Sequence, residues 1–286
     1  MVLADKYINP LTDFGFKKLF GEEVNKDLLI DFLNQLLPEK HKIKDLTYNK
    51  NEHLPVSEFD RRAIFDLYCE SKTGEKFIVE VQRAKQNYFK DRSVYYASFP
   101  IQQQAIKGSE WDFKLDAVYT IGILDFIFEE DKDDKEYIHT VQLKNQKNKV
   151  FYDKLTFIYI ELPKFEKQVD SLESKVEKWL FVFRHLAKLQ DRPLSLQEKI
   201  FQKLFAAAEI AKYSKEERAI YEESLKYYRD LKNVVDTAYD DGKSDGKIEG
   251  KIEEKNKIAR KLKLMGLSIE QIQEASGLSK EEIEKL

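Results

Sequence analysis

The first part of the chain carries apolar residues at helical spacing. Leucine and phenylalanine recur every three or four residues from Leu28 to Leu37, and Pro38 follows the last of them. Such a stripe predicts an amphipathic helix that packs against a core, and a proline commonly ends it. We therefore expect residues 1 to about 55 to be mainly helical.

From residue 61 the pattern becomes that of β-strands. Two short segments, 61–71 and 75–83, have period-two character and are rich in β-branched and aromatic residues. The loop between them, residues 72–74, reads Lys-Thr-Gly. Together they predict a β-hairpin with a short glycine-containing loop.

The following 80 residues are expected to complete an α/β core. An almost continuous apolar run at 115–126 is typical of a strand that is buried on both faces. A helix is expected between the hairpin and this strand, and a helix between strands predicts an α/β fold with a mixed sheet flanked by helices. The predicted elements are a helix over about 86–107, interrupted near Pro100, and strands over 115–126, 137–143 and 155–162, with a charged loop over 129–136.

After Pro163 the pattern is helical again. We predict three helical segments within 170–231, broken near Pro193 and Ser214, that pack on the sheet as a helical region. A glycine then recurs every four residues, at 242, 246 and 250. Because glycine costs a helix about 1 kcal/mol relative to alanine, this segment is either a solvated linker or a weak helix, and it suggests a boundary. The expected division is 1–166, 167–238 and 239–286.

The C-terminal tail reads as three short helices. Ser268, with Gln271 three residues later, predicts a capping box, and Ser279 is expected to cap the last helix. The arrangement resembles a small helix-turn-helix unit. The last helix is acidic, whereas recognition helices usually carry basic or amide groups. DNA contact and oligomerisation or simple packing both remain open for this tail.

Composition limits the class of protein. The chain has 286 residues, of which 42% are hydrophobic and 13% aromatic, enough for a substantial core. Charged residues reach 35%, yet the net charge is only -3, so a DNA-binding surface would require local segregation of charge. Cys69 is the single cysteine, which excludes a disulfide framework and a cysteine-rich zinc site. We see no signal peptide and no apolar stretch near the ~18 residues of a membrane span, and expect a cytoplasmic protein.

The candidate chemistry lies in the hairpin. If residues 72–74 form its loop and Ser71 pairs with Glu75, then Asp66 stands directly opposite Glu80. Two facing carboxylates in apolar strands repel each other and are costly to bury, and a Mg²⁺ ion would resolve both problems. The structural alternative is that Asp66 hydrogen-bonds to a loop and that Glu80 pairs with a base, for which the candidates are Arg62, Arg83 and Lys85.

Several segments in fixed order resemble the Rpn family of recombination-promoting nucleases and transposases, within the PD-(D/E)XK nuclease superfamily. The opening YINPLTDFGFKKLFG and the strands YTIGILDF and FIYIELPKF are similar to that family. So is the block that runs from EVQ to FKDRSVYYASFPIQQQAIKG. The resemblance covers residues 5–166 well and the rest loosely. Within the central block the matching positions are Arg92, Tyr95, Tyr96, Gln103 and Gly108.

The resemblance implies a restriction-endonuclease-like fold and a metal-dependent DNA endonuclease, with Asp66 and Glu80 as ligands of Mg²⁺ or Mn²⁺. The third catalytic position, usually lysine in the superfamily, is Gln82 here, as it is in the Rpn family. Glutamine supplies neither a cation nor a general base at neutral pH, but it can orient a water or hold a phosphate. Candidates for the missing positive charge are Lys85, Lys17 and Lys18, with Asp13 as a further candidate at the edge of the site.

Contacts to DNA are expected from the helix after the hairpin. Arg92 and Tyr96 are four residues apart and share a helix face, which suits a phosphate clamp; a packed tyrosine beside a surface arginine is the alternative. Lys18 is a third candidate. The expected function is hydrolysis of double-stranded DNA, linked to recombination or mobile elements, by a protein that could form homo-oligomers. The rivals are a strand transferase with the same metal chemistry and a non-catalytic DNA-binding or assembly protein with the nuclease fold.

Overall fold

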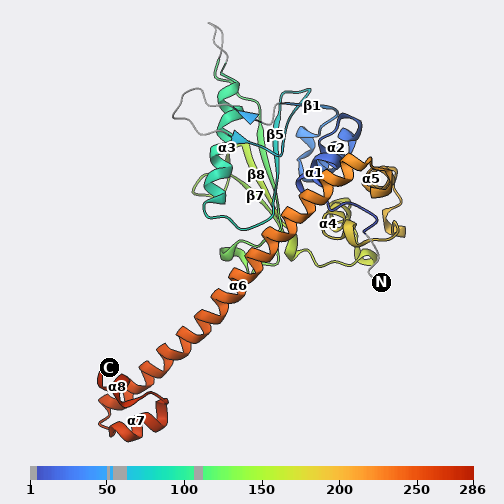
Figure 1. Ribbon diagram of the computed structural model, residues 1–286. Coiled ribbons are helices and arrows are strands. Elements are labelled where there is room, and N and C mark those ends of the chain that lie inside the picture. The colour runs from blue at the N-terminus through green and yellow to red at the C-terminus, as the bar shows by residue number, and fades with distance from the viewer. Residues whose placement is uncertain (1–4, 50–51, 54–62, 106–111) are drawn as a thin grey trace. The chain divides into compact units, whose positions relative to one another are not determined.

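The chain folds into two compact units, the first ending at Leu231 and the second comprising Lys232–Leu286. Figure 1 shows the computed structural model, which describes residues 5–49, 52–53, 63–105 and 112–286. Arg62 and Gly108, which the sequence pattern singled out, lie outside the described residues.

A six-stranded mixed sheet forms the centre of the first unit, as predicted, in the order β1-β4-β5-β6-β8-β7. β5, β6 and β8 run parallel to one another, while the remaining pairs in the sheet are antiparallel. β2 and β3 form a separate two-stranded pair. The strands are β1 (Leu46–Tyr48), β2 (Glu52–His53), β3 (Ala63–Ile64), β4 (Leu67–Ser71), β5 (Lys76–Gln82), β6 (Val118–Leu124), β7 (Ile138–Lys144) and β8 (Val150–Glu161).

Helices cover both faces of this sheet, which explains why every residue of β6 is buried. α3 (Phe89–Gln103) lies on one face, where Phe89 and Ala97 pack against β6 and β8. On the other face the main core joins the sheet to α1 (Asp13–Phe20), α2 (Lys26–Leu36), α4 (Lys175–His185) and α5 (Lys199–Ala208). Trp179 and Phe183 of α4 contact Phe20 and Phe32 there, with ring centroids 5.1–5.8 Å apart.

The prediction that residues 1 to about 55 are mainly helical is wrong beyond Leu36. The chain forms α1 and α2 as expected, but β1 then pairs with the outer edge of β4. A strand of three residues is too short to show periodicity, so only its long-range pairing reveals it. The predicted strand 61–71 is likewise two elements, because β3 pairs with β2 whereas β4 pairs with β5.

The later helices follow the predicted order. Pro100 lies inside α3 instead of interrupting it, and α6 (Lys215–Leu264) runs without a break through the glycine repeat. α7 (Ile269–Ser276) and α8 (Lys280–Glu284) begin with the predicted capping boxes at Ser268 and Ser279.

The three-part domain division stays a prediction. None of the helices that the structure describes combines the length and apolar character needed to cross a bilayer.

Candidate active site

The hairpin of β4 and β5 has the register that the sequence predicts. Leu67 pairs with Val79, and the backbone N–H of Ser71 donates to the carbonyl of Glu75 at 2.9 Å. One step beyond Leu67, this register places Asp66 across from Glu80. The predicted hairpin register is therefore confirmed, and both carboxyl groups line one cavity.

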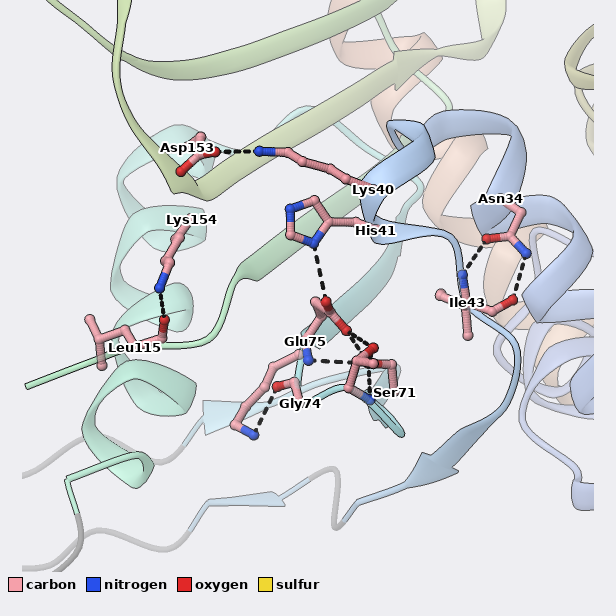
Figure 2. A network of polar contacts seen from close by, with 12 residues as sticks. Asn34, Lys40, His41, Ile43, Ser71, Gly74, Glu75, Leu115, Asp153 and Lys154 are labelled. Atoms are coloured by element: carbon pink, nitrogen blue, oxygen red, sulfur yellow. Dashed lines mark hydrogen bonds and ion pairs between the residues drawn. The ribbon is translucent and has the colours of Figure 1, made fainter. Parts of the chain in front are cut away.

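A polar network at the hairpin loop fixes this register (Figure 2). The carboxylate of Glu75 accepts hydrogen bonds from the hydroxyls of Ser71 and Thr73, and its second oxygen lies 3.2 Å from Nδ1 of His41. These donors hold the pKa of Glu75 at about 2, despite its burial. Gly74 adopts a positive φ of 99°, which a residue with a side chain rarely takes. A shift of the strand pairing by one residue would turn every side chain of the strand to the opposite face of the sheet. By fixing the pairing, this loop indirectly positions the two carboxylates.

The Asp66 side chain is held by the backbone of the opposite strand. Its Oδ2 accepts a hydrogen bond from the N–H of Val81 at 2.7 Å. Burial raises the pKa of Asp66, while this hydrogen bond and the nearby charge of Arg83 act in the opposite direction. The orientation of the Asp66 side chain is therefore fixed, and ionising it in this buried position is costly.

Glu80 is the more strongly perturbed of the two carboxyl groups. Burial, reinforced by the charge of Asp66, raises the pKa of Glu80 to about 8. Its side chain is only 13% exposed, and Nη2 of Arg92 lies 3.8 Å from Oε2. One guanidinium at that distance only partly offsets the repulsion, so additional positive charge at this point would favour the ionised form.

Gln82, at the third position of the motif, holds an arginine. Its Nε2 donates to the carbonyl of Ala84 at 2.9 Å, which aims Oε1 at Nη2 of Arg92, 2.6 Å away. Nη1 of Arg92 also donates to Oε1 of Gln86. Gln82 therefore fixes a guanidinium beside Glu80, and a guanidinium is a cation that a glutamine cannot itself provide.

Tyr96 packs against the core and also contacts Arg92 at the cavity wall. Its ring packs edge-on against Phe65 with centroids 5.2 Å apart, and the Arg92 guanidinium lies 5.7 Å from its centroid. It also lines the same cavity as Arg92. Tyr95, in contrast, is 42% exposed and is absent from the cavity wall.

These side chains surround one cavity of about 190 Å³. Asp66, Glu80 and Gln82 form its floor on the hairpin, and α3 contributes Arg92 and Tyr96. Sequence reasoning missed the other side chains of its wall as site residues. They are Val81, Arg83 and Gln86, in or next to the motif, and Tyr227 and Leu231 from the first part of α6.

Arg83 could have been found from its position beside the motif. Its Nε donates to the carbonyl of Leu11 at 2.7 Å, which fixes the guanidinium at the cavity wall. No local signal marks Tyr227 and Leu231, because they meet the hairpin only through the packing of α6. That packing includes hydrogen bonds from the Asn9 N–H to the Tyr221 hydroxyl and from the Tyr228 hydroxyl to Asp125.

The structure does not bring the three predicted lysines into this cavity. Lys85 is exposed and lies 3.7 Å from Glu129, and Lys18 bonds to Glu22 and Glu217, 2.8 Å from each. Lys17 pairs with Asp13 at 2.8 Å on α1. The charges of that pair reach Asp66 and act on its pKa in opposite directions, so Lys17 and Asp13 stand at the edge of the site.

The donor set fits a magnesium ion. Mg²⁺ commonly takes one or two carboxylates and completes its octahedron with waters and substrate phosphates. Asp66 and Glu80 supply two carboxylates whose mutual repulsion a cation would relieve. Among the residues that the structure describes, no cluster of three or more histidine, cysteine or acidic side chains forms a richer metal site.

Comparison with known proteins agrees with this geometry. Residues 10–238 match the family described as PD-(D/E)XK nuclease family transposase. No curated protein and no solved structure matches the chain. The family match spans the sheet, the carboxylate hairpin, α3 and the first part of α6. The chain therefore belongs to the PD-(D/E)XK nuclease family transposases.

Proposed function

We propose that this protein is a metal-dependent DNA endonuclease that hydrolyses phosphodiester bonds. The observation that carries the proposal is the pair of facing carboxylates, Asp66 and Glu80, on the floor of a cavity that also holds two arginines. Carboxylates for a hard cation and guanidinium groups for a phosphate are the two components that phosphodiester hydrolysis requires. Double-stranded DNA in the cytoplasm, in recombination or mobile-element movement, is the proposed substrate.

In this proposal Asp66 and Glu80 hold Mg²⁺ or Mn²⁺. When bound, the cation supplies a Lewis acid that lowers the pKa of water and offsets negative charge on the phosphate. Because burial and the charge of Asp66 raise the pKa of Glu80 to about 8, a bound cation would favour the ionised form of this carboxyl group. The hydrogen bond from Val81 keeps Asp66 oriented for the same ion.

The remaining side chains bind and orient the substrate. Gln82 and Gln86 hold the Arg92 guanidinium in place, and we assign Arg92 to a non-bridging phosphate oxygen. Arg83, fixed by the Leu11 carbonyl, is assigned the charge that lysine usually supplies in the superfamily. The ring of Tyr96 stabilises the Arg92 guanidinium through a cation–π contact.

A nicking assay on supercoiled plasmid with Mg²⁺ or Mn²⁺ tests the proposal. Asp66→Asn and Glu80→Gln keep the shape of each side chain but remove a charged ligand, so each is expected to lower nicking by about 100-fold or more. Glu70→Gln is the matched control, because Glu70 lies on β4 outside the cavity and pairs with Lys76. Equal nicking by wild type and Asp66→Asn, or no nicking with either metal, would contradict the proposal.

One observation favours the rival, a non-catalytic DNA-binding or assembly protein with the nuclease fold. Both ends of the Gln82 amide are already engaged, by Ala84 and by Arg92, and no lysine lines the cavity wall among the described residues. Titration with Mn²⁺ separates the two hypotheses without DNA. The rival expects no binding that depends on Asp66 and Glu80. A strand transferase would share the metal site, and it differs from a hydrolase in joining the cut strand to a second DNA.

A further inference from the structure

A second cavity lies between α3 and the strands β7 and β8, and none of its wall belongs to the candidate active site. Its volume is about 470 Å³, which falls within the ~300–1,000 Å³ typical of small-molecule sites. The body of the cavity is apolar. The apolar side chains that line it include Val94, Phe128, Val141, Leu143, Phe157 and Tyr159.

Several of these apolar groups face solvent instead of the core. The side chains of Val94 on α3 and of Val141 and Leu143 on β7 are 57%, 48% and 52% exposed. The aromatic floor is preformed, since the rings of Phe157 and Tyr159 are stacked with centroids 6.3 Å apart. Exposed apolar groups around a preformed concavity are typical of a ligand site.

The polar part of the wall includes His139, which contacts Glu161, a residue that is fully buried at the end of β8. The Glu161 carboxylate accepts a hydrogen bond from the backbone N–H of Phe128, and its Oε2 lies 2.5 Å from Nζ of Lys164. Nε2 of His139 lies 2.9 Å from Oε2 of the same carboxylate, so the imidazole is held in a fixed orientation at the cavity wall.

A lysine lines the same cavity. Nζ of Lys90 lies 4.3 Å from the centroid of the Phe128 ring, and both side chains line the cavity together with His139. Lys90 also pairs with Glu130, whose carboxylate is 59% exposed and therefore weakly held. The negative charge of Glu161 is already met by Lys164 and by the backbone N–H of Phe128. A ligand beside Phe128 consequently meets the positive charge of the Lys90 ammonium group.

We propose that this cavity binds a small amphiphilic anion, with a hydrocarbon or aromatic body between α3 and β7–β8 and a single carboxylate or sulfonate at Lys90. The apolar lining supplies the affinity through burial of apolar surface, and the lysine charge selects for the anionic head. The site is independent of the proposed nuclease activity, because the two cavities share no lining residue.

The test uses 8-anilinonaphthalene-1-sulfonate as a fluorescent probe on the full-length protein, with displacement by decanoate and by decanol. Wild type is expected to bind one probe per chain in a saturable manner, and decanoate should displace it better than decanol. Val94→Asp introduces a negative charge into the cavity wall and should weaken probe binding by about tenfold or more. The control is Val150→Asp, an identical change at a residue on β8 that is 46% exposed and outside the cavity, and it should bind like wild type.

A second variant tests the lysine charge. Lys90→Gln should weaken decanoate several-fold and leave decanol unchanged, because only the anion interacts with the lysine charge. Far-UV circular dichroism establishes that each variant is folded. Non-saturable binding by wild type, equal affinities of Val94→Asp and Val150→Asp, or equal displacement by decanoate and decanol would each overturn the proposal.

Discussion

Glu80 links the chemistry of the site to the stability of the fold. Its pKa of about 8 in the folded protein, caused by burial and by Asp66, compares with about 4.3 in an unfolded chain. Between these two values the folded state binds a proton that the unfolded state has released. The contribution of Glu80 to the free energy of unfolding is therefore greatest below the lower pKa and falls, by up to about 1.4 kcal/mol per pH unit, as the pH rises through the window.

We predict that Glu80→Gln removes this dependence. In EDTA the melting temperature of wild type should fall relative to that of Glu80→Gln between about pH 5 and pH 8, and the variant should melt at or above wild type at the upper end. Thermal melts at several pH values measure the difference, with Glu70→Gln as the control. A Glu80→Gln protein several degrees less stable than wild type at about pH 8 would mean that the carboxylate is structurally paired, with Arg92 as the nearest candidate.

At the scale of elements, local patterns predicted what depends on neighbouring residues. The hairpin register followed from the Lys-Thr-Gly loop, and the capping boxes at Ser268 and Ser279 followed from side chains three residues apart. β1 was missed because its identity depends on pairing with β4 more than 20 residues later. Tyr227 and Leu231 were missed for the same reason, since α6 reaches the cavity only through tertiary packing.

The glycine repeat of α6 provides a test at this scale. Gly242, Gly246 and Gly250 lie inside the helix, and a Cβ atom at each would meet nothing within 4 Å. Replacing all three by alanine should therefore stabilise the helix by up to about 1 kcal/mol per position. Amide hydrogen exchange across residues 240–252 should slow, while plasmid nicking stays at the wild-type rate. Unchanged exchange would indicate that this segment is not a stable helix in solution.

At the scale of the whole molecule, the two faces of the sheet have different tasks. The face toward α1, α2, α4 and α5 holds the main apolar core. The other face carries Glu80 in line with Gly122 and Tyr159 of the neighbouring strands, beneath α3. Both cavities lie on this face: Arg92 of α3 lines the carboxylate cavity, and Val94 of the same helix lines the apolar cavity.

Net charge could not predict this arrangement. The chain carries a net charge of -3, but the candidate site places two arginines beside two carboxylates that repel each other. The sequence motif indicated the carboxylates, because alternation along two strands is a local property. The positive charge was expected from lysines, whereas the cavity wall carries Arg83 and Arg92. The Leu11 carbonyl and Gln82 hold these guanidinium groups through contacts that local sequence patterns do not specify.

The central claim is that Asp66 and Glu80 bind one divalent cation. The most direct measurement is the anomalous diffraction of crystals of the full chain grown with Mn²⁺. We predict one anomalous peak in the carboxylate cavity, within about 2.0–2.4 Å of an oxygen atom from both Asp66 and Glu80, and no such peak in crystals of Asp66→Asn. A wild-type cavity without a peak at saturating Mn²⁺, or an ion bound by only one of the two carboxylates, would contradict it.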